Sequence, residues 1–311
     1  MSIASQSSAA DATAQGCVAC VGVFDGVHRG HQALVACARR RADDLGIPVV
    51  VVTFDPLPIS VVRPGSAPTL LATLDDRIEM LLDAGADRVD VLRFDADLAA
   101  TEPEEFVERI LVGRLRVREI VVGENFRFGH RARGTPETLR VEGTRLGFEV
   151  SVLPITGAAD ARWSSTRTRR LIADGEVAAA ADALGRPYRL DGVVVHGDHR
   201  GRGLGFPTAN VQWVGSPTIP ADGVYAGWLT TADERYPAAI SVGTNPQFDG
   251  RERRVEAYAL DRDDLDLYGQ SVGVWFTDRI RGQETFPDVA ALVERIRQDV
   301  AAARNLLVGR G

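Results

Sequence analysis

The sequence predicts two domains of different class: a doubly wound α/β domain and, after it, a small antiparallel β-barrel with a closing helix. A chain of 311 residues, 45% hydrophobic and 25% charged, is long enough for two globular cores. From residue 17 to about residue 186, short β-branched runs alternate with longer amphipathic stretches. From about residue 187, short alternating runs are separated by Gly, Pro and Thr, which is typical of antiparallel strands and turns.

The first domain, residues 17–186, has the pattern of a parallel sheet with crossover helices. Its expected strands are CVACVGVF, PVVVVTF, RVDVLRF, VREIVVG and FEVSVLPI. Amphipathic stretches such as DDRIEMLLDAGA and PEEFVERILVGRL lie between them and are expected to be helices. Strict alternation of the two kinds predicts a doubly wound, Rossmann-like arrangement.

The second domain, residues 187–311, is expected to be the barrel. Runs such as YAGWLTT, AAISVG and RVEAYAL alternate apolar and polar residues, and we expect the aromatic side chains of Tyr225, Trp228 and Phe248 in its core. The stretch PDVAALVERIRQDVAAARNLL then has helical periodicity with a proline at its start, Pro287, and is the predicted closing helix.

Charge and composition exclude several classes of partner. A net charge of −7 disfavours a general nucleic-acid or acidic-membrane binder, and no apolar run approaches the ~20 residues of a membrane span. Residues 1–16 are small and polar without a signal-peptide pattern, and are expected to be a disordered tail. We therefore expect a cytoplasmic protein whose partners are small molecules, and the sequence leaves weak self-association open.

The cysteines do not form a redox motif in this interpretation. Cys17 and Cys20 have C-x-x-C spacing, but they lie within an expected buried strand, where an odd spacing places them on opposite faces. Three cysteines without a disulfide framework fit a reducing compartment.

The loop GVFDGVHRGHQ is the first candidate site, since ligands of open α/β sheets bind at the carboxyl ends of the strands. Gly26 and Gly30 permit a tight turn, and the first amides of a helix beginning near His31 offer donors to a phosphate. His28 and His31 add donors to the charge that develops on a transferring phosphoryl group. The alternative is that both histidines merely cap or solvate a turn.

This loop resembles a known signature. H-R-G-H at residues 28–31 resembles the H-x-G-H motif of nucleotidylyltransferases, and the longer string resembles the form found in prokaryotic FAD synthetases. The resemblance implies an adenylyltransferase domain joined to a riboflavin kinase domain. It implies catalytic roles for His28 and His31, with Gly22, Phe24, Gly26 and Gly30 around the nucleotide.

Two further segments of the first domain resemble the same family. VVGENFRFGHRARGT resembles the G-x-[DN]-F-x-F-G segment, which implies nucleotide contacts for Asn125 and Arg127. The alternative is that FRF simply packs; we favour a mixed role, in which the aromatic side chains pack and Asn125 contacts the ligand. His130, Arg131 and Arg133 would add a basic rim. RWSSTRTRRLIADGEV resembles the S-S-T-x-I-R segment, with Ser164 or Ser165 as helix N-cap. It implies a second phosphate site formed by Ser164, Ser165, Thr166, Arg167 and Arg169, against the alternative of an ordinary capped basic helix.

One position departs from the family pattern. The family usually shows F-x-P-H-P after its second strand, whereas this chain has FDPLP, with Leu57 in place of the histidine. Leucine cannot donate a hydrogen bond to phosphate, so the departure raises the alternative of an impaired adenylyl-transfer step. Asp25 and Asp55, which flank these segments, are expected to be turn formers.

The barrel carries the longest match. GDHRGRGLGFPTANVQW resembles the riboflavin kinase element G-x-x-R-G-R-x-L-G-F-P-T-A-N, which implies ATP contacts for Gly201, Gly203, Gly205 and Pro207. Thr208 and Asn210 lie two residues apart, so on one strand they face the same side and can hold Mg²⁺. His196 and His199 are expected to be loop residues because no third metal ligand lies near them in the sequence.

The resemblance also assigns residues beyond this loop. It implies that Glu256 is the general base that accepts the proton of the riboflavin 5′-hydroxyl, and that Asn245 and Arg251 contact the flavin. The chain is thus expected to phosphorylate riboflavin with ATP and Mg²⁺, giving FMN, and then to adenylylate FMN, giving FAD and pyrophosphate. The alternatives are a riboflavin kinase without adenylyl transfer and a non-catalytic flavin-binding protein.

Overall fold

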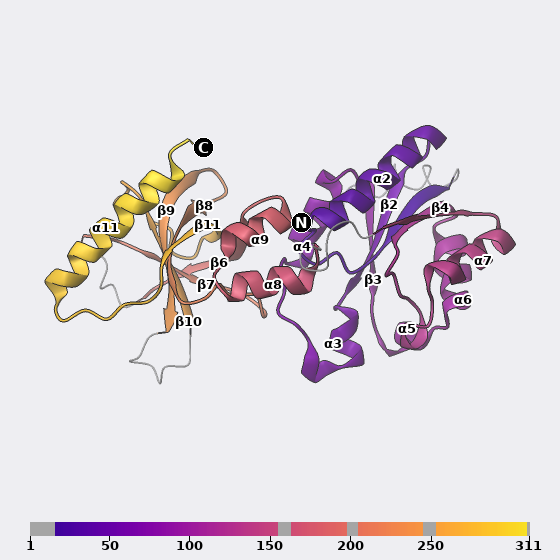
Figure 1. Cartoon of the computed structure of the whole chain (residues 1–311), viewed down its shortest axis with the longest axis horizontal. Coiled ribbons are helices and arrows are strands. Elements are labelled where there is room, and N and C mark those ends of the chain that lie inside the picture. The colour runs from indigo at the N-terminus through magenta and orange to yellow at the C-terminus, as the bar shows by residue number, and fades with distance from the viewer. Residues whose placement is uncertain (1–15, 155–162, 198–204, 245–252, 310–311) are drawn as a thin grey trace. The chain divides into compact units, whose positions relative to one another are not determined.

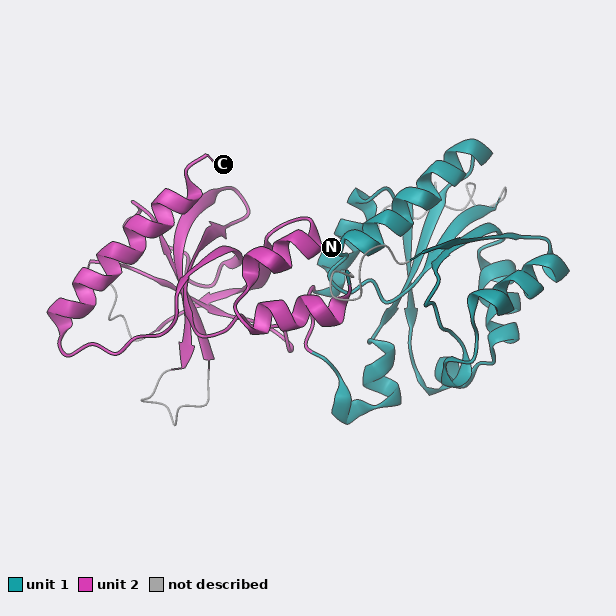
Figure 2. Ribbon diagram, viewed as in Figure 1, with its two compact units in different colours: residues 1–68, 73–163 teal, residues 69–72, 164–311 magenta. Residues whose placement is uncertain are grey.

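The computed structural model describes residues 16–154, 163–197, 205–244 and 253–309 (Figure 1). The expected tail therefore lies outside the described residues, except for Gly16. The chain forms two compact units, residues 1–68 with 73–163 and residues 69–72 with 164–311 (Figure 2). The second unit thus includes residues 164–186, whereas the sequence analysis places the domain boundary after residue 186.

The first unit contains the predicted doubly wound parallel sheet. Its strand order is β3-β2-β1-β4-β5, so β1 lies in the centre and the chain runs outward from it in both directions. All four neighbouring pairs are parallel. The strands are β1 (Cys17–Val21), β2 (Val49–Asp55), β3 (Arg88–Arg93), β4 (Val117–Gly123) and β5 (Glu149–Leu153).

Helices connect these strands, and several of them are shorter than the sequence pattern predicts. The stretch PEEFVERILVGRL forms a short α-helix that continues as a π-helix rather than one regular helix. The helices are α2 (Arg29–Leu45), α3 (Pro58–Val62), η2 (Pro64–Ser66), α4 (Leu74–Asp83), α5 (Ala96–Ala100), α6 (Pro103–Phe106), η3 (Val107–Arg114), η4 (His130–Ala132) and α7 (Pro136–Leu146).

The two faces of the sheet bury separate cores. One core contains Val18 and Cys20 of β1 with apolar residues of α2 and α4. The other contains Cys17 of β1 with residues of η3 and α7. The prediction that Cys17 and Cys20 point to opposite faces is confirmed. Burial raises the pKa of the Cys17 thiol to about 12 and that of Cys20 still further, so neither thiol is a ready nucleophile.

The second unit is the predicted closed antiparallel barrel, with strand order β10-β7-β6-β11-β8-β9. Its core contains the apolar side chains that alternate along each strand, Tyr225 among them, and Trp228 is also buried. Phe248 lies outside the described residues. The strands are β6 (Tyr188–Val195), β7 (Ala209–Gln212), β8 (Gly223–Thr230), β9 (Arg235–Thr244), β10 (Arg253–Ala259) and β11 (Ser271–Arg281).

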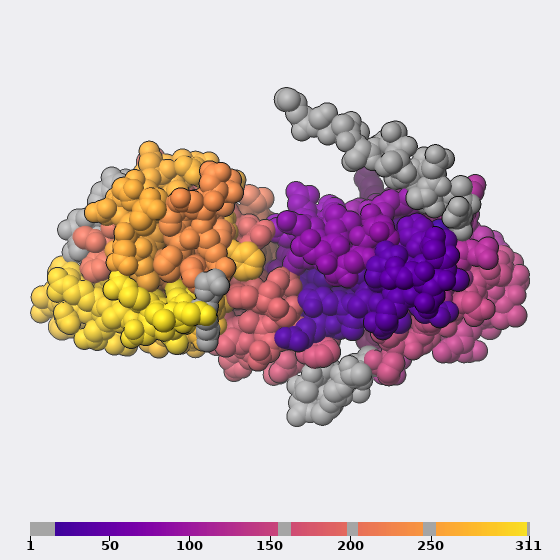
Figure 3. All heavy atoms as spheres, turned by 90° about the horizontal axis from the view of Figure 1, so that it is seen from above, coloured from indigo at the N-terminus to yellow at the C-terminus, as the bar shows by residue number. Residues whose placement is uncertain are grey.

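Among the described residues, helices α8, α9 and α11 pack on the barrel. α8 (Ser165–Ala173) and α9 (Val177–Leu184) contribute Ile172, Val177 and Leu184 to the barrel core. The closing helix α11 (Val289–Leu307) begins after the N-cap Asp288 and lies along the outside of the barrel, where Figure 3 shows it in yellow against the orange strands.

A short segment from the first half of the sequence belongs to the second unit. Leu70 accepts a hydrogen bond from the backbone N–H of Thr218 and donates its own to Ser216, and Leu71 is buried in the barrel core. Arg169 donates from Nε to the Thr69 carbonyl at 2.6 Å. The chain therefore passes between the units three times, at 68/69, 72/73 and 163/164.

The contacts between α11 and the barrel include one nearly buried ion pair, which gives a testable expectation. Arg281 of β11 donates through Nε and Nη2 to the carboxylate of Asp299 on α11, and both side chains are nearly buried. Asp299→Ala removes these charge-assisted hydrogen bonds and leaves Arg281, among the carboxylates that the structure describes, only the more distant Glu284, at 4.0 Å, so we expect a loss of about 1.5–3 kcal/mol in unfolding free energy. Urea unfolding followed by the fluorescence of the barrel tryptophans measures it. Glu294→Ala, which breaks the exposed pair with Arg297, should cost at most about 1 kcal/mol; equal losses would contradict the assignment.

Candidate active sites

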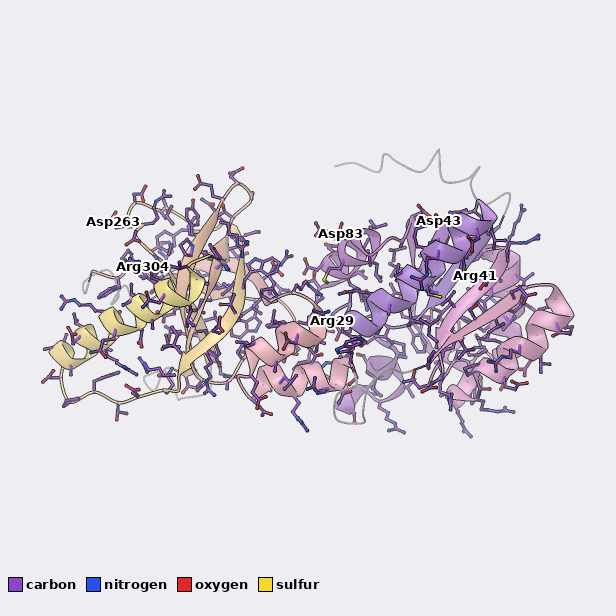
Figure 4. The ribbon with its side chains drawn as sticks, turned by 45° about the horizontal axis from the view of Figure 1, so that its top comes forward. Arg29, Arg41, Asp43, Asp83, Asp263 and Arg304 are labelled. Atoms are coloured by element: carbon purple, nitrogen blue, oxygen red, sulfur yellow. The ribbon has the colours of Figure 1, made fainter. Side chains whose placement is uncertain are left out.

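The first candidate site lies at the carboxyl edge of the parallel sheet, beside the position where the strand order reverses. The loop after β1 leads into α2, and the loop after β4 begins beside it because β1 and β4 are hydrogen-bonded neighbours. In open α/β sheets this crevice is where ligands bind. Figure 4 shows Arg29 at the end of α2 that receives the loop, with Arg41 and Asp43 toward the opposite end.

The loop after β1 is closely packed although it is irregular. Phe24, Asp25 and Val27 are each only 1% exposed. Phe24 and Val27 have positive φ angles of 53° and 38°, which non-glycine residues rarely adopt. Backbone strain of this kind is kept only where the surroundings hold it, and it is frequent at ligand sites.

The two histidines of the H-x-G-H motif stack on each other. Their ring centroids lie 3.6 Å apart with an interplanar angle of 17°. His28 is the N-cap of α2, and its Nδ1 accepts a long hydrogen bond of 3.4 Å from the backbone N–H of His31. A Cβ on Gly30 would lie 3.1 Å from Cε1 of His28, so glycine allows the imidazole to lie against the helix start. His28 thus caps the helix, and its contact with phosphate stays a prediction.

The electrostatics favour an uncharged His31. Burial, and then the neighbouring His28, lower the pKa of His31 well below its usual value, and the buried Nδ1 of His31 has no hydrogen-bond partner among the described residues. A neutral His31 at the start of α2 is compatible with a bound phosphate, whose negative charge the N-terminus of a helix favours.

Two buried polar side chains behind this loop were not singled out by the sequence analysis. Arg77 of α4, 3% exposed, donates to the carbonyl oxygens of Val23 at 3.0 Å and Phe54 at 3.1 Å. Thr53 of β2 also donates to the Val23 carbonyl, at 3.0 Å. An arginine on an amphipathic helix is normally solvated, so its sequence pattern carries no signal of this burial.

The loop after β4 combines packing with one exposed polar residue. Phe128 is buried and stacks with Phe126 at 5.4 Å, so the aromatic side chains pack, as the mixed role predicts. Asn125 is exposed at the end of β4, where its Oδ1 lies 3.2 Å from the position a Cβ would take on Gly123. Arg127 is exposed, and Arg133 pairs with Glu102. Asn125 and Arg127 thus remain available to a ligand at the switch point.

Two further positions from the sequence analysis, Ser164 and Leu57, lie at the N-termini of helices. Ser164 is the N-cap of α8 and accepts from the backbone N–H of Arg167, as predicted. α8 belongs to the second unit, so a phosphate site shared by residues 164–169 and the histidines stays a prediction. Leu57, at the N-cap of α3, is 6% exposed.

The second candidate site lies on β7 and β10 of the barrel. Glu256 pairs with Asn210 in the antiparallel register, and Thr208 donates from Oγ1 to Oε2 of Glu256 at 3.1 Å. Ala209, Val211, Val255 and Ala257 point into the core, so Thr208, Asn210 and Glu256 face outward together. A Cβ on Gly197 would lie 2.4 Å from Nδ2 of Asn210, which shows how closely the loop after β6 approaches this side chain.

This donor set suits a hard cation. The hydroxyl oxygen of Thr208 and the amide oxygen of Asn210 are ligand types that Mg²⁺ takes together with water and phosphate, and the carboxylate of Glu256 lies beside them. Within the described part of the chain, no three His, Cys, Asp or Glu side chains come together to hold a metal. His196 stacks on Tyr268 at a centroid distance of 4.0 Å.

Several predicted residues lie outside the described part of the chain. These are Gly201, Gly203, Asn245 and Arg251, together with His199. Gly205 and Pro207 are described. They precede Thr208, which lies directly before the first residue of β7.

Comparison with known proteins identifies the family. A model of FAD synthetase matches residues 10–167, and a model of riboflavin kinase matches residues 184–307. The bifunctional riboflavin kinase/FMN adenylyltransferase of Escherichia coli (strain K12) is 36% identical over 292 residues, which is 94% of this chain and 93% of the relative. That of Pseudomonas fluorescens is 39% identical over 293 residues, 94% and 93% of the two chains.

The chain belongs to the bifunctional riboflavin kinase/FMN adenylyltransferase family. A solved structure from Streptococcus pneumoniae, named a macrolide-efflux protein, is 33% identical with a TM-score of 0.84, covering 93% of this chain and 94% of its own. Its name differs from both family models, and we take the two-unit fold from it rather than the named activity. No helix among the described residues is long and apolar enough to cross a bilayer.

The buried His31 gives a pH-dependent stability. Its pKa in the folded chain lies below the unfolded value of about 6.5, so the unfolded state binds a proton first as the pH falls. Stability should therefore be lost below about pH 6.5, by about 1.4 kcal/mol for each pKa unit of difference. Unfolding free energies of the wild-type and His31→Asn chains between pH 5 and 7.5 measure this, since the variant should show a shallower slope. Identical slopes would contradict the burial of a neutral imidazole.

Proposed function

We propose that this chain makes FMN from riboflavin and ATP in the barrel unit, and FAD from FMN and a second ATP in the parallel-sheet unit. Family membership across both units supports the pair of activities. The observation that carries the assignment is that each unit has its own cluster of polar groups of the kind that the corresponding reaction needs. One is the stacked histidine pair at the sheet's switch point, and the other is the Thr208, Asn210 and Glu256 set on the barrel.

In the kinase step, Glu256 acts as general base. Its carboxylate accepts the proton of the riboflavin 5′-hydroxyl while that oxygen bonds to the γ-phosphorus and ADP leaves. The Thr208 hydroxyl holds one carboxylate oxygen at 3.1 Å and so restricts the orientation of the base. When Mg²⁺ is bound with ATP at Thr208 and Asn210, it offsets the charge of the phosphates.

In the adenylyl step, a phosphate oxygen of FMN bonds to the α-phosphorus of ATP, and pyrophosphate leaves. His28, His31 and the first amides of α2 donate to the charge that develops on the phosphorus oxygens. Ser164, Ser165, Thr166, Arg167 and Arg169 are proposed to hold the leaving pyrophosphate, and Asn125 and Arg127 the nucleotide. Leu57 supplies no donor, so on this proposal the other groups carry the step.

We place the enzyme in the cytoplasm, where ATP is available. Its three cysteines are free thiols, which fits a reducing compartment.

One incubation separates the proposal from its two rivals. The purified chain is given riboflavin, Mg²⁺ and ATP, and riboflavin, FMN and FAD are resolved by chromatography over time. Sequential formation of FMN and FAD supports two active sites. FMN without FAD would indicate a kinase alone, and flavin binding without ATP consumption would indicate a non-catalytic binding protein.

Glu256→Gln should separate the two steps. Loss of the base should lower FMN formation by about 10²-fold or more, while added FMN is still converted to FAD. The same exchange at exposed Glu234, in the turn between β8 and β9, is the control and should leave both rates unchanged. An equal loss of both steps in Glu256→Gln would contradict independent sites.

His28→Asn should separate capping from catalysis. Asparagine caps helices as well as any residue, so α2 keeps its N-cap, but the imidazole donor is lost. FAD formation from FMN should fall by about 10²-fold, with FMN formation and the unfolding free energy nearly unchanged. A variant that keeps its FAD rate would reduce His28 to a cap.

A further inference from the structure

Arg77 joins the two segments that surround the histidine site. It lies in α4. Its Nη1 donates to the Val23 carbonyl in the loop after β1, and its Nη2 donates to the Phe54 carbonyl of β2. Each carbonyl therefore has a charged donor at 3.0–3.1 Å, an ordinary hydrogen-bond distance. One guanidinium thus links the loop that leads to His28 with the strand that leads to Leu57.

The Val23 carbonyl is held by two donors, and its orientation decides where the next ring lies. Thr53, which is fully buried, donates to the same oxygen at 3.0 Å. With that peptide fixed, Phe24 adopts its φ of +53°, and its ring meets His31 edge-on, with centroids 5.0 Å apart and an angle of 65°. The chain of contacts from Arg77 to the imidazole contains only one peptide and one aromatic ring.

Burial of the Arg77 guanidinium costs free energy, because the charged group loses its hydration. Burial lowers the pKa of Arg77, while the charges of Asp25 and Asp55 act in the opposite direction. Its Nε has no hydrogen-bond partner among the described residues. Two of the guanidinium's five N–H donors thus hold backbone carbonyls, that of Val23 in the loop and that of Phe54 in β2, and water would satisfy the Val23 carbonyl if the loop moved outward.

We propose that Arg77 is a positioning residue for adenylyl transfer, which holds the Val23 carbonyl with Thr53 and thereby sets Phe24 and the stacked imidazole of His31. This inference rests on the proposed function of the parallel-sheet unit. It differs from a contact with substrate, because Arg77 acts through the backbone of the loop.

The kinetic test compares Arg77→Met and Arg77→Lys with a matched control. Arg77→Met keeps the length of the side chain and removes both hydrogen bonds, so kcat for FAD formation from FMN should fall by about tenfold or more with a much smaller change in the KM for ATP. Arg77→Lys keeps the charge and a donor and should recover part of that loss. FMN formation from riboflavin by the same chains is the internal control. Arg140→Met, on the exposed face of α7, should change nothing.

A second variant keeps the proposal testable if Arg77→Met does not fold. Thr53→Val is isosteric and removes only the other donor to the Val23 carbonyl. Because Arg77 and Thr53 act on one oxygen, the Arg77→Lys/Thr53→Val double variant should be about as slow as the slower single variant. A loss equal to or larger than the product of the two single losses would overturn the shared role.

Histidine NMR supplies a readout that a general loss of stability would not produce. The chain has five histidines, so selective ¹⁵N-imidazole labelling yields few signals. In Arg77→Lys and Thr53→Val, the signals of His28 and His31 should move while those of His196 in the barrel stay in place. Unmoved His28 and His31 signals, or an unchanged kcat in Arg77→Met, would overturn the inference. A wild-type chain that makes no FAD would instead overturn the proposed function itself.

Discussion

The stacking of the His28 and His31 imidazoles at the start of α2 is the interaction on which the parallel-sheet site depends. It requires a helix that begins directly after a tight loop and a residue without a Cβ at position 30, since a Cβ there would lie 3.1 Å from Cε1 of His28. Phe24 and Val27 of that loop are buried, and the Phe24 ring meets that of His31 edge-on. On the proposed function, a phosphate bound there would meet donors held in place, so that little reorganisation is needed when charge develops.

The site on the barrel is built from a carboxylate, a hydroxyl and an amide rather than from imidazoles. Phosphoryl transfer from ATP to a hydroxyl requires a base and a counter-charge, and outward-facing positions of adjacent antiparallel strands can place both side by side. The register pairs Glu256 with Asn210, and the residue before β7 supplies the hydroxyl that orients the carboxylate. The core positions between them are small or β-branched, which lets the barrel close without disturbing the outer face.

The segment 69–72 belongs to the second unit, although it lies within the stretch of sequence that otherwise forms the first. Thr69 and Leu70 bond to residues of the second unit, and Leu71 enters the barrel core, although α4 begins only three residues later in the first unit. The compact units therefore differ from the stretches that periodicity separates. Short apolar segments such as this one carry no periodic signal, since four residues complete about one helical turn or two strand repeats.

Much of this protein was determined by local sequence alone. Alternation of β-branched runs and amphipathic stretches predicts the parallel sheet, the Gly- and Pro-rich second half predicts the barrel, and the family motifs point to the histidine pair and to Thr208, Asn210 and Glu256. These features are visible because they depend on residues close together in the chain. The tertiary structure decided the rest: that Ser164–Ala173 packs with the barrel, that Thr69 meets Arg169, and that Arg77 turns inward to the carbonyls of Val23 and Phe54. Those contacts join residues many positions apart, and a pattern of period 3.6 or 2 cannot distinguish a solvated arginine from one that is buried and hydrogen-bonded.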